Sequence, residues 1–300
     1  MTILMGVMVS FYFFPIEFTF LPGINTKMAM AGGGLVVLFI QLARQRMLQI
    51  DNGFFNLSLI ALAVSFLGFV SVAYNETYDY TYATYIVSMW VWLSGAYVVV
   101  TTMRALHGYM SVKLVCNYFI AICAAQCISA LIMDFVPLSK EVIDTYVSGY
   151  GYVDASNMTD GGRLYGIGAG LDVGGLKFSA SLVVIAHVLV NTMKNKSFRL
   201  TSLYFTAFAI ITIVGNMIAR TTTVGVILAF FYWLYVFYKQ RERIKPQDLV
   251  IWSLPIMILL IAAVAVTVHF YNTNDDFRAN IRFAFEGFFS LWNDVVWFVS

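Results

Sequence analysis

The chain contains nine apolar segments of a length that suits the crossing of a lipid bilayer. A transmembrane helix needs about 20 mostly apolar residues to span a hydrocarbon core of about 30 Å. The nine segments are Ile3–Leu21, Met28–Ala43, Phe54–Ala73, Thr84–Met103, Leu114–Met133, Leu176–Met193, Leu200–Ile218, Thr222–Tyr238 and Val250–Phe270. Only 11% of the 300 residues are charged, too few to cover a water-soluble domain. We therefore expect an all-α integral membrane protein with about nine transmembrane helices.

The basic residues predict how these segments are threaded. Cytoplasmic connections of membrane proteins are enriched in Lys and Arg. Alternate connections contain eleven of the 18 basic residues and three of the 16 acidic residues, so one side carries a charge of +8 and the other −6. The eleven are Arg44, Arg46, Arg104, Lys113, Lys194, Lys196, Arg199, Lys239, Arg241, Arg243 and Lys245. This pattern predicts a multi-pass protein with a cytoplasmic N-terminus.

Two regions on the external side contain most residues outside the predicted spans. A large loop, residues 134–175, separates the fifth and sixth segments, and loops of this length are often functional. A second external segment, residues 271–300, follows the ninth span. We therefore divide the chain into a transmembrane bundle, residues 1–270, and the start of this second segment. Its apolar end, Val295–Ser300, is typical of a truncated chain.

Arginine is the most informative residue type on the external side. Four of the seven external basic residues are arginines, namely Arg163, Arg220, Arg278 and Arg282. The guanidinium fork binds phosphate groups through paired hydrogen bonds, so these residues fit a diphosphate or an anionic lipid head group. Arg220 begins the eighth segment, where threonines and free N–H groups would help to hold an anion. The alternatives are that Arg220 snorkels to lipid phosphates and that Arg163 lies in a flexible loop.

Few residues are placed to act as a general base on the external side. His269 lies at the outer end of the ninth segment and is a candidate base, with anchoring at the membrane interface as the alternative. Asp172 follows a glycine run in which Gly166, Gly170 and Gly174 recur every four residues. In a re-entrant segment, Asp172 would orient Arg163 or accept a proton. His187 lies within a span, where we expect a packed or hydrogen-bonded residue.

The three cysteines and the sparse histidines do not indicate a metal or redox site. Cys116, Cys123 and Cys127 share one face of a predicted helix and therefore cannot bridge one another. We interpret them as small buried hydrophobic residues. No cofactor, metal or nucleic acid is expected.

The arginine motifs resemble those of the bacterial O-antigen polymerase and O-antigen ligase superfamily. In this chain, Arg163-Leu164-Tyr165-Gly166 leads through a glycine-rich stretch to Leu176, and Ala219-Arg220-Thr221 begins a later span. The segment from Phe277 to Phe289 is similar to the second external loop of polysaccharide polymerases. Ala219 replaces a serine that is common in the family, and no histidine follows His269 where ligases have a catalytic one.

The resemblance implies a glycosyltransferase of the bacterial inner membrane. Its substrate would be a polyprenyl-diphosphate-linked oligosaccharide, and its product an O-antigen, capsule or exopolysaccharide polymerised at the outer face. Arg163 and Arg220 would bind the diphosphate, with Arg278 and Arg282 as weaker candidates. A chain-length regulator and a flippase of the same pathway are further partners that the resemblance implies.

Three other functions are compatible with the sequence. A ligase would transfer the glycan to the lipid A core, and a transporter or flippase would move the lipid-linked glycan across the membrane. Transporters place ionisable residues near the middle of the membrane, whereas here the ionisable residues in the middle of predicted spans are few, namely Glu17 and His187. A membrane scaffold would leave the external arginines unexplained. We expect a polymerase in preference to a ligase.

Overall fold

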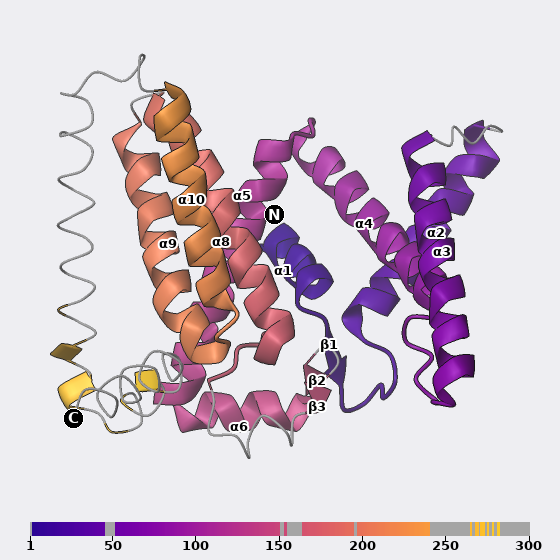
Figure 1. The fold of residues 1–300 in the computed structure, drawn as a ribbon, viewed down its shortest axis with the longest axis horizontal. Coiled ribbons are helices and arrows are strands. Elements are labelled where there is room, and N and C mark those ends of the chain that lie inside the picture. The colour runs from indigo at the N-terminus through magenta and orange to yellow at the C-terminus, as the bar shows by residue number, and fades with distance from the viewer. Residues whose placement is uncertain are drawn as a thin grey trace. The chain divides into compact units, whose positions relative to one another are not determined.

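The computed structural model describes residues 2–45, 52–150, 153–154, 164–194 and 197–240, together with residues 265, 268–269, 271–273, 275, 278 and 281–282. These residues form two compact units (Figure 1). The first unit comprises Met1–Tyr12 and Gly23–Met110, and the second comprises Phe13–Pro22 and Ser111–Ser300.

The first unit is helical. Its helices are α1 (Thr2–Phe13), α2 (Thr26–Gln45), α3 (Asn52–Asn75) and α4 (Tyr85–His107). Asn25 accepts a hydrogen bond from the N–H of Met28 at the start of α2 (2.9 Å), and Gly108 ends α4 in the left-handed conformation, so both ends follow common capping rules.

Small residues allow α2 and α4 to approach closely. A Cβ atom added to Gly34 would lie 2.7 Å from the side-chain oxygen of Ser94. The Ser94 hydroxyl donates a hydrogen bond to the carbonyl of Ala31 (2.8 Å). Glycine and serine at such contacts are typical of helix pairs in membranes, where packing replaces the hydrophobic effect as the driving force.

The second unit combines membrane-length helices with a small sheet. Its helices are α5 (Val112–Phe135), α6 (Pro137–Tyr146), α8 (Leu171–Lys194), α9 (Phe198–Ile218) and α10 (Thr222–Gln240). Its strands are β1 (Ile16–Phe18), β2 (Val147–Tyr150) and β3 (Val153–Asp154), which pair antiparallel in the order β1-β2-β3. Ser179 of α8 lies against Gly225 of α10, where an added Cβ atom would be 2.6 Å from the Ser179 carbonyl oxygen.

Six helices of the described chain are long and apolar enough to cross a membrane: α2, α3, α4, α5, α8 and α9. α10 is a shorter apolar helix over Thr222–Val236. These helices agree with seven of the predicted segments. The chain is therefore a multi-pass membrane protein, whereas the prediction of about nine spans is not confirmed, because residues 250–264 of the ninth segment lie outside the described residues.

The first predicted span, Ile3–Leu21, is wrong. α1 ends at Phe13 and the chain continues into β1, because Pro15 disfavours a helical conformation at Phe14. At about 1.5 Å per residue, the 12 residues of α1 extend about 18 Å, which is less than the hydrocarbon core. Glu17 consequently lies in a strand paired with Gly149 and not within a span. The sheet also shows that the fold is mostly, and not entirely, helical.

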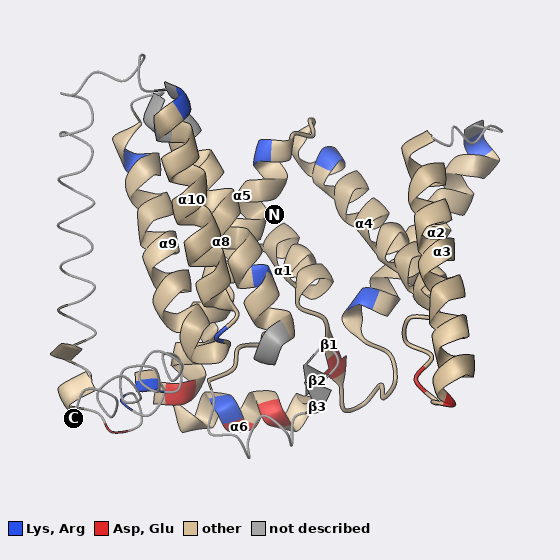
Figure 2. Ribbon diagram, in the orientation of Figure 1, with Lys and Arg blue, Asp and Glu red and all other residues tan. Residues whose placement is uncertain are grey.

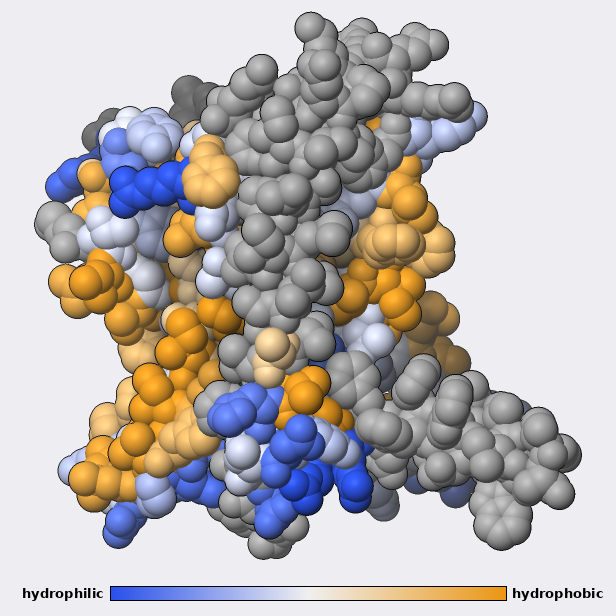
Figure 3. Space-filling model, turned by 90° about the vertical axis from the view of Figure 1, so that its left-hand side faces the viewer, coloured by the Kyte–Doolittle hydropathy of each residue, from blue (hydrophilic) through white to orange (hydrophobic). Residues whose placement is uncertain are grey.

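Charged residues lie mostly near the ends of the helices within each unit (Figure 2). In the first unit, Arg44 and Arg104 lie in the last turns of α2 and α4. In the second unit, Lys113, Arg199 and Lys239 lie in the terminal turns of α5, α9 and α10, which is the end predicted to be cytoplasmic. The surface in Figure 3 is hydrophobic at middle height, with hydrophilic residues above and below. This distribution is typical of a protein in a bilayer.

Candidate functional site

Arg220 lies in the turn between α9 and α10, at the end of the second unit predicted to be external. α9 ends at Ile218 and α10 begins at Thr222. The side chain of Arg220 is exposed, whereas its neighbours Ala219 and Thr222 are buried. The turn therefore holds one cationic side chain at the surface between two buried anchors.

The polar groups around Arg220 hold the turn closed. The N–H groups of Thr222, Thr223 and Val224 donate to the carbonyls of Ala219, Arg220 and Thr221, at 3.0 to 3.1 Å. The hydroxyl of Thr222 donates to the carbonyl of Gly215 (3.0 Å), and that of Thr223 to the side-chain oxygen of Asn216 (2.7 Å). The expectation that the N–H groups of residues 222–224 and the hydroxyls of Thr222 and Thr223 are available to an anion is therefore wrong. The Thr221 hydroxyl is buried and has no hydrogen-bond partner among the described residues, so it remains of the predicted anion site together with the Arg220 guanidinium.

The first turns of α8 pack directly against this turn. A Cβ atom added to Gly175 would lie 2.7 Å from the Cβ atom of Ala219 and 3.2 Å from that of Thr221. Ser179, one turn further along α8, donates a hydrogen bond to the Thr221 carbonyl (2.6 Å). Ala219 is thus in close contact with a glycine. The start of α8 and the turn that contains Arg220 therefore lie side by side.

The glycine-rich segment before α8 is buried and not helical. Gly166 and Ala169 exchange backbone hydrogen bonds in a tight turn (2.8 and 3.3 Å). Gly168 has a φ of +86°, and a Cβ atom there would lie 2.6 Å from the Phe14 carbonyl oxygen, so only glycine fits. At Gly166, an added Cβ atom would lie 2.7 Å from the Gln126 carbonyl oxygen. α8 begins only at Leu171, so Gly166 and Gly170 do not form a bare helix edge together with Gly174.

Tyr165 ties this buried segment to α6. Its side chain is only 5% exposed, and its hydroxyl donates a hydrogen bond to a carboxylate oxygen of Asp144 (2.8 Å). Burial, and then the neighbouring Asp144 carboxylate, raise the pKa of Tyr165 above its ordinary value. The ammonium group of Lys140 lies 5.3 Å from the centre of the Tyr165 ring. This arrangement fixes the protein backbone two residues after Arg163.

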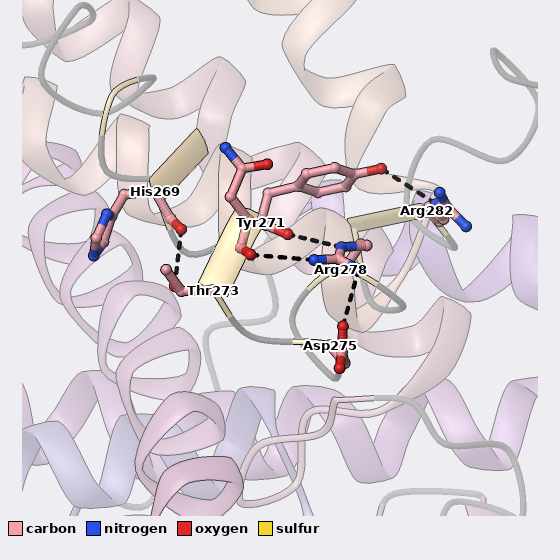
Figure 4. A network of polar contacts seen from close by, with 7 residues as sticks. His269, Tyr271, Thr273, Asp275, Arg278 and Arg282 are labelled. Atoms are coloured by element: carbon pink, nitrogen blue, oxygen red, sulfur yellow. Dashed lines mark hydrogen bonds and ion pairs between the residues drawn. The ribbon is translucent and has the colours of Figure 1, made fainter.

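Arg278 and Arg282 form a network within their own segment (Figure 4). Arg278 donates to the carbonyls of Tyr271 and Asn272 (2.9 and 3.2 Å) and forms an ion pair with Asp275 (2.9 Å). Arg282 donates through Nε to the Tyr271 hydroxyl (3.2 Å). All three nitrogens of the Arg278 guanidinium thus have a partner nearby, which favours a structural role for Arg278 over binding of a diphosphate.

The remaining predicted site residues are placed only in part. Arg163 lies outside the described residues, and Asp172 is in the first turn of α8 without a described side chain. The imidazole of His269 is exposed and lies on the other side of Figure 4 from Arg278 and Arg282. His187 lies within α8 and makes a hydrogen bond to the Tyr232 hydroxyl (2.7 Å), as expected for a residue inside a span.

Sequence reasoning missed three lysines on the side predicted to be external, each of which lies over an aromatic ring. The distances from the ammonium nitrogen to the ring centre are 4.6 Å for Lys27 and Trp92, 4.8 Å for Lys177 and Phe14, and 5.3 Å for Lys140 and Tyr165. Such contacts stabilise a cation near an apolar surface. The ring partners are distant in the sequence, so no local pattern could indicate them.

Among the described residues, no group of three or more His, Cys, Asp or Glu side chains could hold a metal ion. Cys116, Cys123 and Cys127 are free thiols, as the sequence predicts. Comparison with known proteins found no matching family model, no matching curated protein and no matching solved structure.

Proposed function

We propose that the protein is a membrane glycosyltransferase that polymerises lipid-diphosphate-linked oligosaccharide repeat units at the outer face of the bacterial inner membrane. One observation carries the proposal: the start of α8 touches the turn that presents Arg220, through Gly175 and Ala219. The glycine-rich segment that follows Arg163 leads into this part of α8. The contact supports a shared site for the two arginines.

The proposed reaction needs a cation at the membrane surface and a base. A hydroxyl oxygen of the acceptor attacks the anomeric carbon of the donor, and the bond from that carbon to the diphosphate oxygen breaks. The hydroxyl proton passes to a base, for which Asp172 and His269 are the candidates, and the polyprenyl diphosphate leaves. A guanidinium group stabilises the negative charge that develops on the leaving oxygen. The exposed position of Arg220 between α9 and α10 supports this role.

Two observations favour transfer at the outer surface over transport of the lipid-linked glycan. Glu17, which the sequence placed within a span, lies in β1. His187, the other such residue, is hydrogen-bonded to Tyr232. A transporter needs ionisable groups along a path through the membrane, and these two residues do not provide one.

The test is the glycan pattern of cells that contain Arg163→Ala or Arg220→Ala in place of the native protein. We expect each variant to abolish extension of the surface polysaccharide at unchanged protein level. The matched control is Arg44→Ala, which removes an exposed arginine from the opposite end of a span and should leave extension intact.

The products distinguish the candidate reactions. A product of a single repeat unit indicates loss of a polymerase, whereas complete loss of glycan on lipid A indicates loss of a ligase. Glycan ladders of normal length in both variants would contradict the proposal.

A further inference from the structure

α6 is amphipathic and leaves its apolar side uncovered. Leu138, Val142 and Tyr146 are spaced four residues apart and so lie along one side of the helix. Their exposed fractions are 69%, 50% and 59%. The other side carries Lys140 and Asp144, which contact Tyr165. One side of α6 therefore covers the buried loop, and the other presents an apolar stripe.

This stripe continues an apolar surface of α5. Near its external end, α5 exposes Ile128, Ile132 and Phe135 at helical spacing. These three residues face lipid if α5 crosses the membrane as its length and composition indicate. Phe135, Val136 and Leu138 are 50%, 46% and 69% exposed, so exposed apolar side chains continue along the sequence from the end of α5 into α6.

The length of α5 places the junction at the edge of the hydrocarbon core. Its 24 residues extend about 36 Å, compared with a core of about 30 Å. Val136, the residue between the two helices, is not helical, with φ −124° and ψ 89°, and Pro137 opens α6. The chain turns there, and α6 lies across the end of α5 (Figure 1). A helix that changes direction at this level remains close to the interface.

We propose that α6 lies in the external interface of the membrane, with Leu138, Val142 and Tyr146 inserted among the lipid acyl chains. A short helix with an apolar stripe and charged residues on its other side binds lipid surfaces in this orientation. Tyr146, at the end of the stripe, has an amphipathic side chain of the type enriched at this depth. The bilayer thus holds α6, and α6 in turn holds Tyr165 through Asp144. This inference does not depend on the proposed function.

The test places a fluorophore along α6 in the full chain. Val142→Cys and Leu138→Cys are labelled with a polarity-sensitive dye, with Glu141→Cys as the matched control at an exposed polar position beside the stripe. The proteins are reconstituted into vesicles of phosphatidylethanolamine and phosphatidylglycerol. The unsubstituted protein, with its three native cysteines, is labelled in parallel as the blank. Because all three substituted positions are exposed, the substitutions should preserve folding, which the melting temperature verifies.

We expect a blue-shifted emission at positions 138 and 142, quenched by lipids that carry a spin label near the head group and protected from aqueous iodide. Position 141 should show red-shifted emission that iodide quenches. Quenching of positions 138 and 142 by iodide to the same degree as position 141 would show that water covers the stripe. Protection from both quenchers would show that protein covers it. Either result would overturn the proposal.

Discussion

The contacts of Tyr165 depend on tertiary structure that its neighbours in the sequence do not reveal. The glycines that follow it permit a loop, a helix with a bare edge or a buried turn. Phe14 and Gln126, which decide in favour of the buried turn, lie far away along the chain. A single sequence identifies Tyr165 as part of a glycine-rich segment, but it cannot indicate Asp144 as its partner.

Removal of the Tyr165 hydroxyl should destabilise the second unit. In Tyr165→Phe, the Asp144 carboxylate loses a hydrogen bond that we expect to contribute about 1.5 to 3 kcal/mol, because its acceptor is charged. The measurement is the thermal unfolding of the protein in lipid nanodiscs. Tyr78→Phe is the control, since the Tyr78 side chain is 93% exposed and its loss of a hydroxyl should leave the melting temperature unchanged. Equal melting temperatures for all three proteins would contradict the structural role of the hydrogen bond.

The same contact predicts a dependence of stability on pH. The pKa of Tyr165 is raised in the folded protein, so the folded state keeps its proton at a pH where the unfolded state releases it. The stability from this contact is complete below the ordinary tyrosine pKa of about 10 and decreases as the pH rises above it. The difference in stability between the wild type and Tyr165→Phe should therefore shrink at alkaline pH. A difference that grows above pH 10 would contradict this reasoning.

At the scale of elements, apolar length predicted most helices correctly and failed where one residue broke a helix. Seven of the nine segments correspond to described helices, because a membrane span depends mainly on composition over about 20 residues. Ile3–Leu21 had the composition of a span but contains Pro15, and α1 stops before it. The pairing of β1 with β2 is a contact between residues more than 100 positions apart, which apolar length cannot reveal.

The three glycines in α2 provide a test of close helix packing. Gly34→Ala would place a Cβ atom 2.7 Å from the Ser94 side-chain oxygen, and overpacking of this kind costs about 1 to 3 kcal/mol. Gly33→Ala is the matched control, because nothing lies within 4 Å of the added atom. We expect Gly34→Ala to lower the melting temperature and Gly33→Ala to leave it unchanged or raise it slightly, since alanine favours helix. Equal effects of the two variants would show that α2 and α4 are not in contact at this point.

At the scale of the whole molecule, the charge pattern predicts which ends of the helices face the cytoplasm. The two turns that flank α4 lie on opposite sides in this prediction: Tyr78 is external, and Tyr109, next to Arg104, is cytoplasmic. The prediction of a cytoplasmic N-terminus assumed that the first segment crosses the membrane completely. Because α1 is too short for that, the location of the N-terminus stays a prediction. The anion site was predicted incompletely, because the N–H groups near Arg220 proved to be engaged within the turn.

Labelling of introduced cysteines in intact cells tests this topology. Tyr78 and Tyr109 are both exposed, so Tyr78→Cys and Tyr109→Cys give thiols of similar access on the two sides. A membrane-impermeant maleimide applied to spheroplasts should label position 78 directly and position 109 only after permeabilisation. The native protein, in which Cys123 and Cys127 are buried, gives the background. The reverse pattern would invert the membrane orientation and place Arg220 in the cytoplasm.

Binding of a polyprenyl diphosphate to the purified protein tests the proposal that the Arg220 guanidinium holds the diphosphate of a lipid-linked glycan. The dissociation constant of a short-chain polyprenyl diphosphate is measured in nanodiscs for the wild type, Arg220→Ala and the control Arg44→Ala. Hydrogen bonds to charged groups contribute about 1.5 to 3 kcal/mol, so Arg220→Ala should weaken binding by about tenfold to a hundredfold. Arg44→Ala should bind like the wild type. Equal affinity of the wild type and Arg220→Ala for the diphosphate would contradict the account.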